Sequence, residues 1–140
     1  MTNSRFDEIE EGDELEPYSV KAGYMELNRF AAANNEFVLI HMDPDYSKDT
    51  AKLPDVIVMG NLKLAYITNM IDAWKGDDGW VSRLEVSFRG MDAVNETLTA
   101  RGVVKEKREE GGQRFVDLDV WVENSEGKKT TPGSATVSLP

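Results

Sequence analysis

The sequence contains no cysteine and only one histidine, His41. Without cysteine the chain can form no disulfide, bind no metal through a thiolate and use no thiolate in catalysis. A zinc site would have to be assembled from carboxylates around a single imidazole, so we expect no metal. The lack of cysteine also favours the cytoplasm as the compartment.

Basic residues and long apolar segments are also scarce. Sixteen Lys and Arg stand against 26 Asp and Glu, which gives a formal net charge of −10. We therefore expect no nucleic-acid partner, because nucleic acid requires a concentrated basic surface. No apolar run approaches the roughly 20 residues of a membrane span, and residues 1–16 lack the basic start and apolar stretch of a secretory signal.

What remains is the composition of one globular domain. The chain has 140 residues, of which 40% are hydrophobic and 30% charged. This length and balance predict a single domain over residues 1–140. Seven of the first 16 residues are acidic, so we expect residues 1–16 to be a lightly anchored acidic lead-in.

Two segments have apolar residues at helical spacing. The first predicts a helix over 24–33 that ends at Asn34 and Asn35. The second predicts a helix over 61–75 that ends at the Gly76–Gly79 turn. Apolar residues occupy nearly all sides of the second helix, so we expect it to be enclosed.

The remaining pattern is that of strands. A short strand is predicted at 18–21, and apolar and polar residues alternate in four later segments, at 83–89, 97–104, 115–122 and 135–139. Period two over several segments indicates a half-buried antiparallel sheet. Turns are expected at 109–112, 124–127 and 131–133. The predicted fold class is α+β, a single hot-dog domain in which an antiparallel sheet wraps around a central apolar helix.

The segment between the two helices carries the most specific motif. It reads Glu36-Phe37-Val38-Leu39-Ile40-His41-Met42-Asp43-Pro44 and leads to Gly60 at the start of the second helix. Together with the closing residues 132–140, this segment resembles the MaoC-like family of enoyl-CoA hydratases and dehydratases. The chain departs from the family pattern at Glu36, which replaces Asp, at Val38-Leu39, which replaces Asn-Pro, and at Met59, which replaces His.

The resemblance implies a hot-dog fold and the hydration of a trans-2-enoyl-CoA to a 3-hydroxyacyl-CoA, or the reverse dehydration. It implies that Glu36 and His41 are the acid–base pair and that Gly60 is the oxyanion donor. Coenzyme A would enter as part of the substrate, and no separate cofactor is expected. The residues expected to contact the substrate are Val38, Tyr46, Val58 and Met59.

These residue types suit the chemistry. Water must lose a proton as it attacks the β-carbon, the α-carbon must gain one, and negative charge develops on the thioester oxygen. A carboxylate and an imidazole on one loop can position the water and transfer both protons. The free amide at a helix start can donate to the developing oxyanion, with support from the helix dipole.

Several alternatives stay open. Val38 and Leu39 make the mouth of the site more apolar, which indicates a bulky acyl group, and some relatives act on lipid or steroid thioesters. The chain could form a homodimer, or a heteromer with a second hot-dog subunit, because a lone sheet leaves an open edge. It could also be a non-catalytic subunit that stabilises an active partner. A thioesterase is less well supported, because the central helix offers only Asp72 near its far end.

The individual residues also have plainer interpretations. Glu36 could be a solvated acid at a helix end, His41 a hydrogen-bonded turn residue, and Gly60 a tight entry to the helix.

Overall fold

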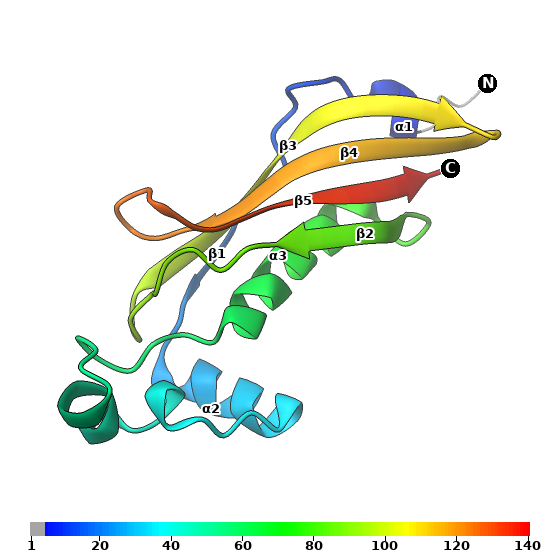
Figure 1. The fold of residues 1–140 in the computed structure, drawn as a ribbon. Coiled ribbons are helices and arrows are strands. Elements are labelled where there is room, and N and C mark those ends of the chain that lie inside the picture. Colours follow the sequence, from blue (N-terminus) through cyan, green and yellow to red (C-terminus); the bar gives the residue numbers. More distant parts are fainter. Residues whose placement is uncertain (1–4) are drawn as a thin grey trace.

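A curled five-stranded antiparallel sheet holds the central helix against its concave face (Figure 1). The computed structural model describes residues 5–140. The strand order is β1-β3-β4-β5-β2, so β1 and β2 are the edges. This arrangement confirms the predicted hot-dog fold. The strands are β1 (Tyr18–Lys21), β2 (Trp80–Val86), β3 (Thr97–Glu110), β4 (Gln113–Glu123) and β5 (Lys129–Leu139).

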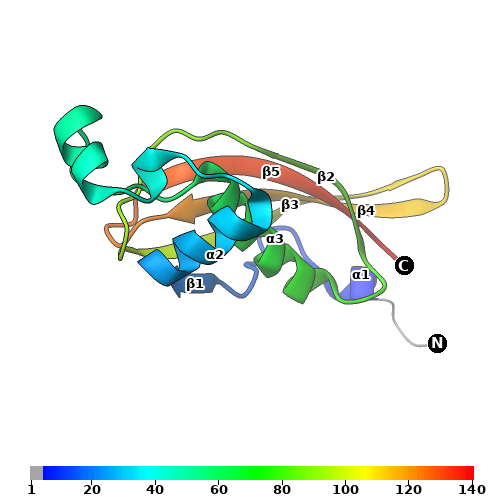
Figure 2. The same ribbon diagram turned by 90° about the horizontal axis from the view of Figure 1, so that it is seen from below.

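In the described part of the chain, three α-helices accompany the sheet, namely α1 (Arg5–Glu8), α2 (Tyr24–Asn34) and the central α3 (Gly60–Lys75). Both predicted helices are confirmed to within a residue at each end. Between α2 and α3 the chain forms a 3₁₀ turn, η1 (Leu39–His41), and a π turn, η2 (Tyr46–Thr50). Figure 2 shows α2 lying beside α3 on the side away from the sheet. Within residues 5–140, no helix combines the length and apolar character that crossing a membrane requires.

The core lies between the sheet and one face of α3. Ile67, Met70 and Ile71 are at most 1% exposed and belong to the same cluster as Leu98 and Leu118 of the sheet. The expectation that α3 is enclosed on all sides is wrong for the single chain. Its opposite face is open, with Asn61, Thr68, Asn69, Asp72 and Ala73 exposed.

The N-terminal segment is anchored more firmly than predicted, although residues 1–4 of the expected lead-in lie outside the described residues. Phe6, Ile9 and Leu15 are buried in the core. The amide of Leu15 donates to Gly102 of β3, and the segment extends the β3 edge beyond β1. The many carboxylates of this segment face solvent, while a few apolar side chains anchor the segment to the core.

The turn predicted at 131–133 is also wrong. β5 starts at Lys129 and runs straight through Pro132 and Gly133. The carbonyl of Pro132 accepts a hydrogen bond from Ser87, which lies just past the last residue of β2. Proline is tolerated there because the neighbouring strand has already ended and no ladder bond is lost.

The buried side chain of Tyr66 leads to a prediction about stability. Its side chain is 3% exposed, and its hydroxyl has no hydrogen-bond partner among residues 5–140. Burial, with smaller contributions from Glu26 and Tyr18, raises the pKa of Tyr66. Because the pKa of Tyr66 is higher in the folded chain than in the unfolded chain, the full stability of the chain is present below the unfolded-state value near 10. Part of this stability is lost as the pH rises above that value.

We therefore expect Tyr66→Phe to keep or increase stability at neutral pH, by up to about 1 kcal/mol, because it removes an unsatisfied buried hydroxyl. The variant should also lose less stability above pH 10 than the parent chain does. Urea denaturation at neutral and alkaline pH measures both effects. A destabilised variant with an unchanged alkaline loss would contradict the prediction.

Candidate active site

Glu36 and His41 lie together directly after α2. The helix ends where Asn35 adopts a left-handed conformation with φ of 52°, and the amide of Glu36 then donates to Ala31. The 3₁₀ turn η1 brings His41 back towards this helix end. As a result Nε2 of His41 lies 3.9 Å from Oε1 of Glu36.

The other ring nitrogen fixes the tautomer of His41. Nδ1 lies 2.7 Å from the carbonyl oxygen of Ile57 in a buried contact. A carbonyl only accepts, so Nδ1 carries the proton and donates it. In the neutral imidazole, Nε2 is therefore an unprotonated acceptor that faces the carboxylate.

Asn34 fixes the other end of the pair, and the sequence analysis missed its role. Its side-chain nitrogen donates to Oε2 of Glu36 at 3.1 Å. This bond leaves Oε1 directed at His41. The signal in the sequence was weak, because an Asn at a helix end is more simply explained as a helix terminator.

Gly60, which begins α3, is linked to this pair through Ile57. The carbonyl of Ile57 holds His41, and Gly60 follows three positions later. No side chain caps α3, and within residues 5–140 the amides of Gly60 and Asn61 have no hydrogen-bond acceptor. Two amide donors at the positive end of a 16-residue helix are therefore available to an anion.

Phe88 explains structurally why residue 60 is glycine. A Cβ atom on residue 60 would lie 3.0 Å from three atoms of the Phe88 ring. The ring is half exposed and belongs to the loop that follows β2. Glycine thus allows this loop to lie directly over the helix start.

A buried ion pair ties the same loop to α3. Nζ of Lys63 lies 2.9 Å from Oδ2 of Asp92 and donates to the carbonyl of Gly90 at 3.0 Å. The hydroxyl of Thr130 donates to the same Asp92 oxygen at 2.6 Å. The side chains of Lys63 and Asp92 are 2% and 0% exposed. The sequence analysis did not find this network, because its members are far apart in the chain.

The four residues predicted to contact the substrate divide into two pairs. Val38 and Tyr46 are exposed on the segment that carries His41. Val58 and Met59 are 3% and 0% exposed and pack in the core. The structure therefore places only Val38 and Tyr46 where a ligand could reach them without rearrangement.

A groove next to the pair separates α2 from the open face of α3. It has a volume of about 350 Å³ and is lined by Phe30, Asn34, Asn61, Leu64, Ala65, Thr68 and Asn69. Asn34 connects this groove to the acid–base pair, since it also bonds Glu36. The groove is mixed in polarity, with apolar side chains at Phe30, Leu64 and Ala65.

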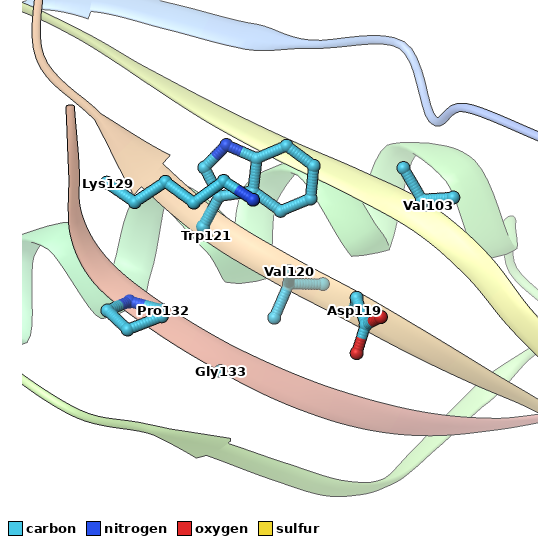
Figure 3. A pocket seen from close by; sticks show the side chains of 7 residues that line it. All are labelled: Val103, Asp119, Val120, Trp121, Lys129, Pro132 and Gly133. Atoms are coloured by element: carbon cyan, nitrogen blue, oxygen red, sulfur yellow. The ribbon is translucent and has the colours of Figure 1, made fainter. Parts of the chain in front are cut away.

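A second hollow lies on the convex face of the sheet (Figure 3). Trp121, Lys129 and Pro132 line it, and Nζ of Lys129 lies 3.8 Å from the centre of the Trp121 ring. It includes none of the predicted site residues.

Farther along this convex face, Arg108 and Thr136 donate hydrogen bonds to Asp117. Burial alone would raise the pKa of Asp117, but these hydrogen bonds outweigh it and hold the pKa below its usual value. The charge of Asp117 is thus already paired within the sheet.

Among residues 5–140, no three His, Asp or Glu side chains come together in a way that could hold a metal ion. The start of α3 thus lies near the side chains of Glu36 and His41, with two free helix amides and an adjacent groove.

Comparison with known proteins identifies the family of this fold. The family model described as the MaoC like domain matches residues 9–126. An (R)-hydratase from A. caviae involved in PHA biosynthesis is 26% identical, with a TM-score of 0.86 over 94% of this chain and 98% of its own. R-hydratase PhaJ1 from Pseudomonas aeruginosa is 24% identical, with a TM-score of 0.87 over 96% and 84%. Among curated proteins, none matches the sequence.

The chain belongs to the MaoC-like family. More distant structures share its fold, such as the ChsH1-ChsH2 complex from Mycobacterium tuberculosis. That structure is 16% identical and has a TM-score of 0.80 over the full length of both chains.

Proposed function

We propose that the protein adds water to the double bond of a trans-2-enoyl thioester, or catalyses the reverse dehydration. The observation that carries this proposal is the pairing of Glu36 and His41. Two hydrogen-bond acceptors face each other across 3.9 Å, and each is oriented by its own partner, Asn34 or Ile57. Similarity to an (R)-hydratase, at 26% identity, supports the same reaction class.

The distance between the two acceptors suits one bridging water. At 3.9 Å they are too far apart for a direct hydrogen bond, and a water between them can donate one O–H to each. Its oxygen lone pair is then free to attack the β-carbon. As the new C–O bond forms, the pair removes one proton from the water and delivers one to the α-carbon, so that H and OH are added across the double bond.

The start of α3 supplies the third requirement. Negative charge moves onto the thioester oxygen during attack, and the uncapped amides of Gly60 and Asn61 can donate to it. Losing one oxyanion donor of this kind in another enzyme costs about 3–4 kcal/mol of barrier. Because Phe88 lies over Gly60, its ring also limits the access of water to these amides.

The acyl group would extend from this centre into the groove between α2 and α3. The exposed apolar run at Phe37, Val38 and Leu39 lies beside Glu36 and would contact a bulky apolar acyl group near the mouth. Coenzyme A would enter and leave as part of the intact thioester, with no other cofactor.

A second subunit is part of the proposal. Among residues 5–140, the edge strand β2 pairs with β5 alone. Trp80, Phe88 and Met91 near this edge are 71%, 52% and 65% exposed. Apolar side chains beside an open strand edge favour association of two sheets. This open strand edge could be covered either in a homodimer or in a heteromer with a second hot-dog chain. A non-catalytic subunit has the same surface, but it has no need for the oriented Glu36 and His41.

The test is hydration of crotonyl-CoA and of a longer enoyl-CoA by the purified chain. We expect loss of the enoyl absorbance and formation of a 3-hydroxyacyl-CoA of a single configuration. A saturated acyl-CoA should release no free thiol, since Asp72 is 61% exposed and paired with Lys75 at the far end of α3. Thiol release would favour a thioesterase, and inactivity on every enoyl thioester would favour the non-catalytic subunit.

A further inference from the structure

Asp92 connects the segment that enters α3 to the first turn of the helix. Its backbone carbonyl accepts a hydrogen bond from the amide of Val58 at 2.8 Å, and its carboxylate lies 2.9 Å from Nζ of Lys63. Val58 lies two positions before Gly60, and Lys63 lies three positions after it. Asp92 therefore holds the chain on both sides of the point where α3 begins.

The segment that enters α3 also anchors His41. The carbonyl of Ile57 accepts a hydrogen bond from Nδ1 of His41 at 2.7 Å, and the amide of Ile57 donates to the carbonyl of Ile40. Ile57 also forms an antiparallel bridge with Ala93, the neighbour of Asp92. Ile57 thus lies between the turn that carries His41 and the segment that carries Asp92.

The two contacts of Asp92 span a joint in the chain. Met59, with φ of −60° and ψ of 137°, is the extended residue that joins the entering segment to α3. Its two backbone torsions are the soft degrees of freedom about which the helix could turn relative to that segment. With both sides tied to Asp92, the acid–base pair and the amides of Gly60 and Asn61 keep a fixed separation.

Stability alone does not account for an ion pair at this joint. The side chains of Lys63 and Asp92 are 2% and 0% exposed, and Oδ1 of Asp92 has no hydrogen-bond partner within residues 5–140. Removing two charges from water is costly, and well-packed apolar residues in such a place often give an equally stable core. What the ion pair adds is direction, because hydrogen bonds fix distance and angle more narrowly than apolar contacts do.

We infer that Asp92 is a positioning residue for the proposed reaction: through Lys63 and Ile57 it fixes the acid–base pair relative to the amides at the start of α3. The inference rests on the proposed function, in which the attacking water lies at the pair and the thioester oxygen lies at the amides. A misplacement of about 1 Å between reacting groups can cost roughly a hundredfold in rate. Asp92 is completely buried, so it acts through its neighbours and touches no reacting atom.

The experiment replaces the polar network by apolar side chains of similar shape. The variant Lys63→Met/Asp92→Leu/Thr130→Val removes both charges and the hydroxyl that donates to Asp92, so none of these three side chains is left with an unpaired polar group. The control Lys75→Met/Asp72→Leu removes an ion pair of the same two residue types from the other end of α3. Circular dichroism melting checks that both variants fold.

With crotonyl-CoA, we expect kcat of the apolar variant to fall about 10- to 100-fold while KM stays within about twofold. Its product should also contain some of the opposite configuration, because the water is no longer fixed on one face of the double bond. The control should match the parent. Combined with His41→Ala, the apolar replacement should cause no further loss of kcat, since no positioned imidazole remains. A role in stability alone would lower the rate by the same factor with and without His41.

A second measurement needs no turnover. His41 is the one histidine of the chain, so its ring gives a single set of imidazole resonances. Its Nδ1 proton, which is bonded to Ile57, should exchange with solvent about tenfold faster in the apolar variant than in the control, because the joint opens more often. Asp92→Asn, which keeps the shape of the side chain, should change kcat and exchange in the same direction by smaller factors, and it replaces the apolar variant if that variant does not fold.

The outcomes separate the inference from the proposed function. If the parent hydrates no enoyl thioester, the proposed function fails, and the exchange of the His41 proton still decides whether Asp92 positions the imidazole. If the parent is active and a folded variant at Asp92 keeps both its kcat and its proton exchange, the positioning role of Asp92 is overturned while the proposed reaction stands.

Discussion

Replacing His41 with alanine is expected to lower kcat for enoyl-CoA hydration about a thousandfold, within the range typical of general acid–base catalysis. Nε2 of His41 is the unprotonated acceptor that faces Glu36, and no other imidazole exists in the chain. KM should change little, because in the proposed mechanism the imidazole would contact the attacking water and not the thioester in the ground state. Steady-state kinetics with crotonyl-CoA measures both constants.

Glu36→Gln tests the other half of the pair. The amide keeps the shape of the carboxylate but gives up the negative charge, and we expect kcat to fall at least about a hundredfold. The combined variant Glu36→Gln/His41→Ala should be about as slow as the worse single variant, because residues that act on one water act as a unit. Losses that multiply would show that the two residues serve separate steps.

The matched control for this series is Lys48→Ala. Lys48 lies on the same segment, and within residues 5–140 its one ion pair, with Asp55, spans 3.9 Å between side chains that are 51% and 36% exposed. Such a pair contributes little to stability, so activity should stay within about twofold of the parent, which corresponds to less than half a kcal/mol. Circular dichroism melting of each variant separates lost chemistry from lost folding, since His41→Ala also leaves the carbonyl of Ile57 without its partner. Full activity in folded His41→Ala would remove the proposed mechanism.

The local features of this fold were predictable from the sequence. Helical spacing located α2 and α3, and period-two alternation located most of the strands. The resemblance to the MaoC-like family implied that Glu36 and His41 act together, and the structure brings these two side chains within 3.9 Å. Each of these features depends on residues that are close together in the chain, where periodicity and turn chemistry carry information.

The features that were missed depend on distant residues. Phe88 meets Gly60, and Lys63 meets Asp92, across 28 and 29 positions respectively. No sequence pattern reveals such contacts without the sheet register. The open face of α3 was missed for a related reason, because periodicity shows that a helix has apolar sides but not whether its own chain covers them.

The buried ion pair is expected to carry the largest effect on stability. Lys63→Met should lower the free energy of unfolding by about 3–5 kcal/mol, because it leaves the charge of Asp92 buried without its counterion. Asp92 is completely buried, and Oδ1 has no hydrogen-bond partner within residues 5–140. After the substitution only the hydroxyl of Thr130 would still contact this carboxylate.

Charge, rather than packing, should account for this loss, and a second variant separates the two. Lys63→Met/Asp92→Asn removes both charges, so it should be more stable than Lys63→Met alone, a non-additive result that direct partners produce. The exposed pair of Arg83 and Glu85 is the control, and Arg83→Met should cost less than about 1 kcal/mol. Urea denaturation of the parent, Lys63→Met, Asp92→Asn and the double variant gives the coupling energy. If Lys63→Met and the double variant are equally destabilised, the lysine acts through its packing. If the coupling is present, the pair is what holds the Phe88 loop over the start of α3, and Lys63→Met should then also lower the rate of hydration.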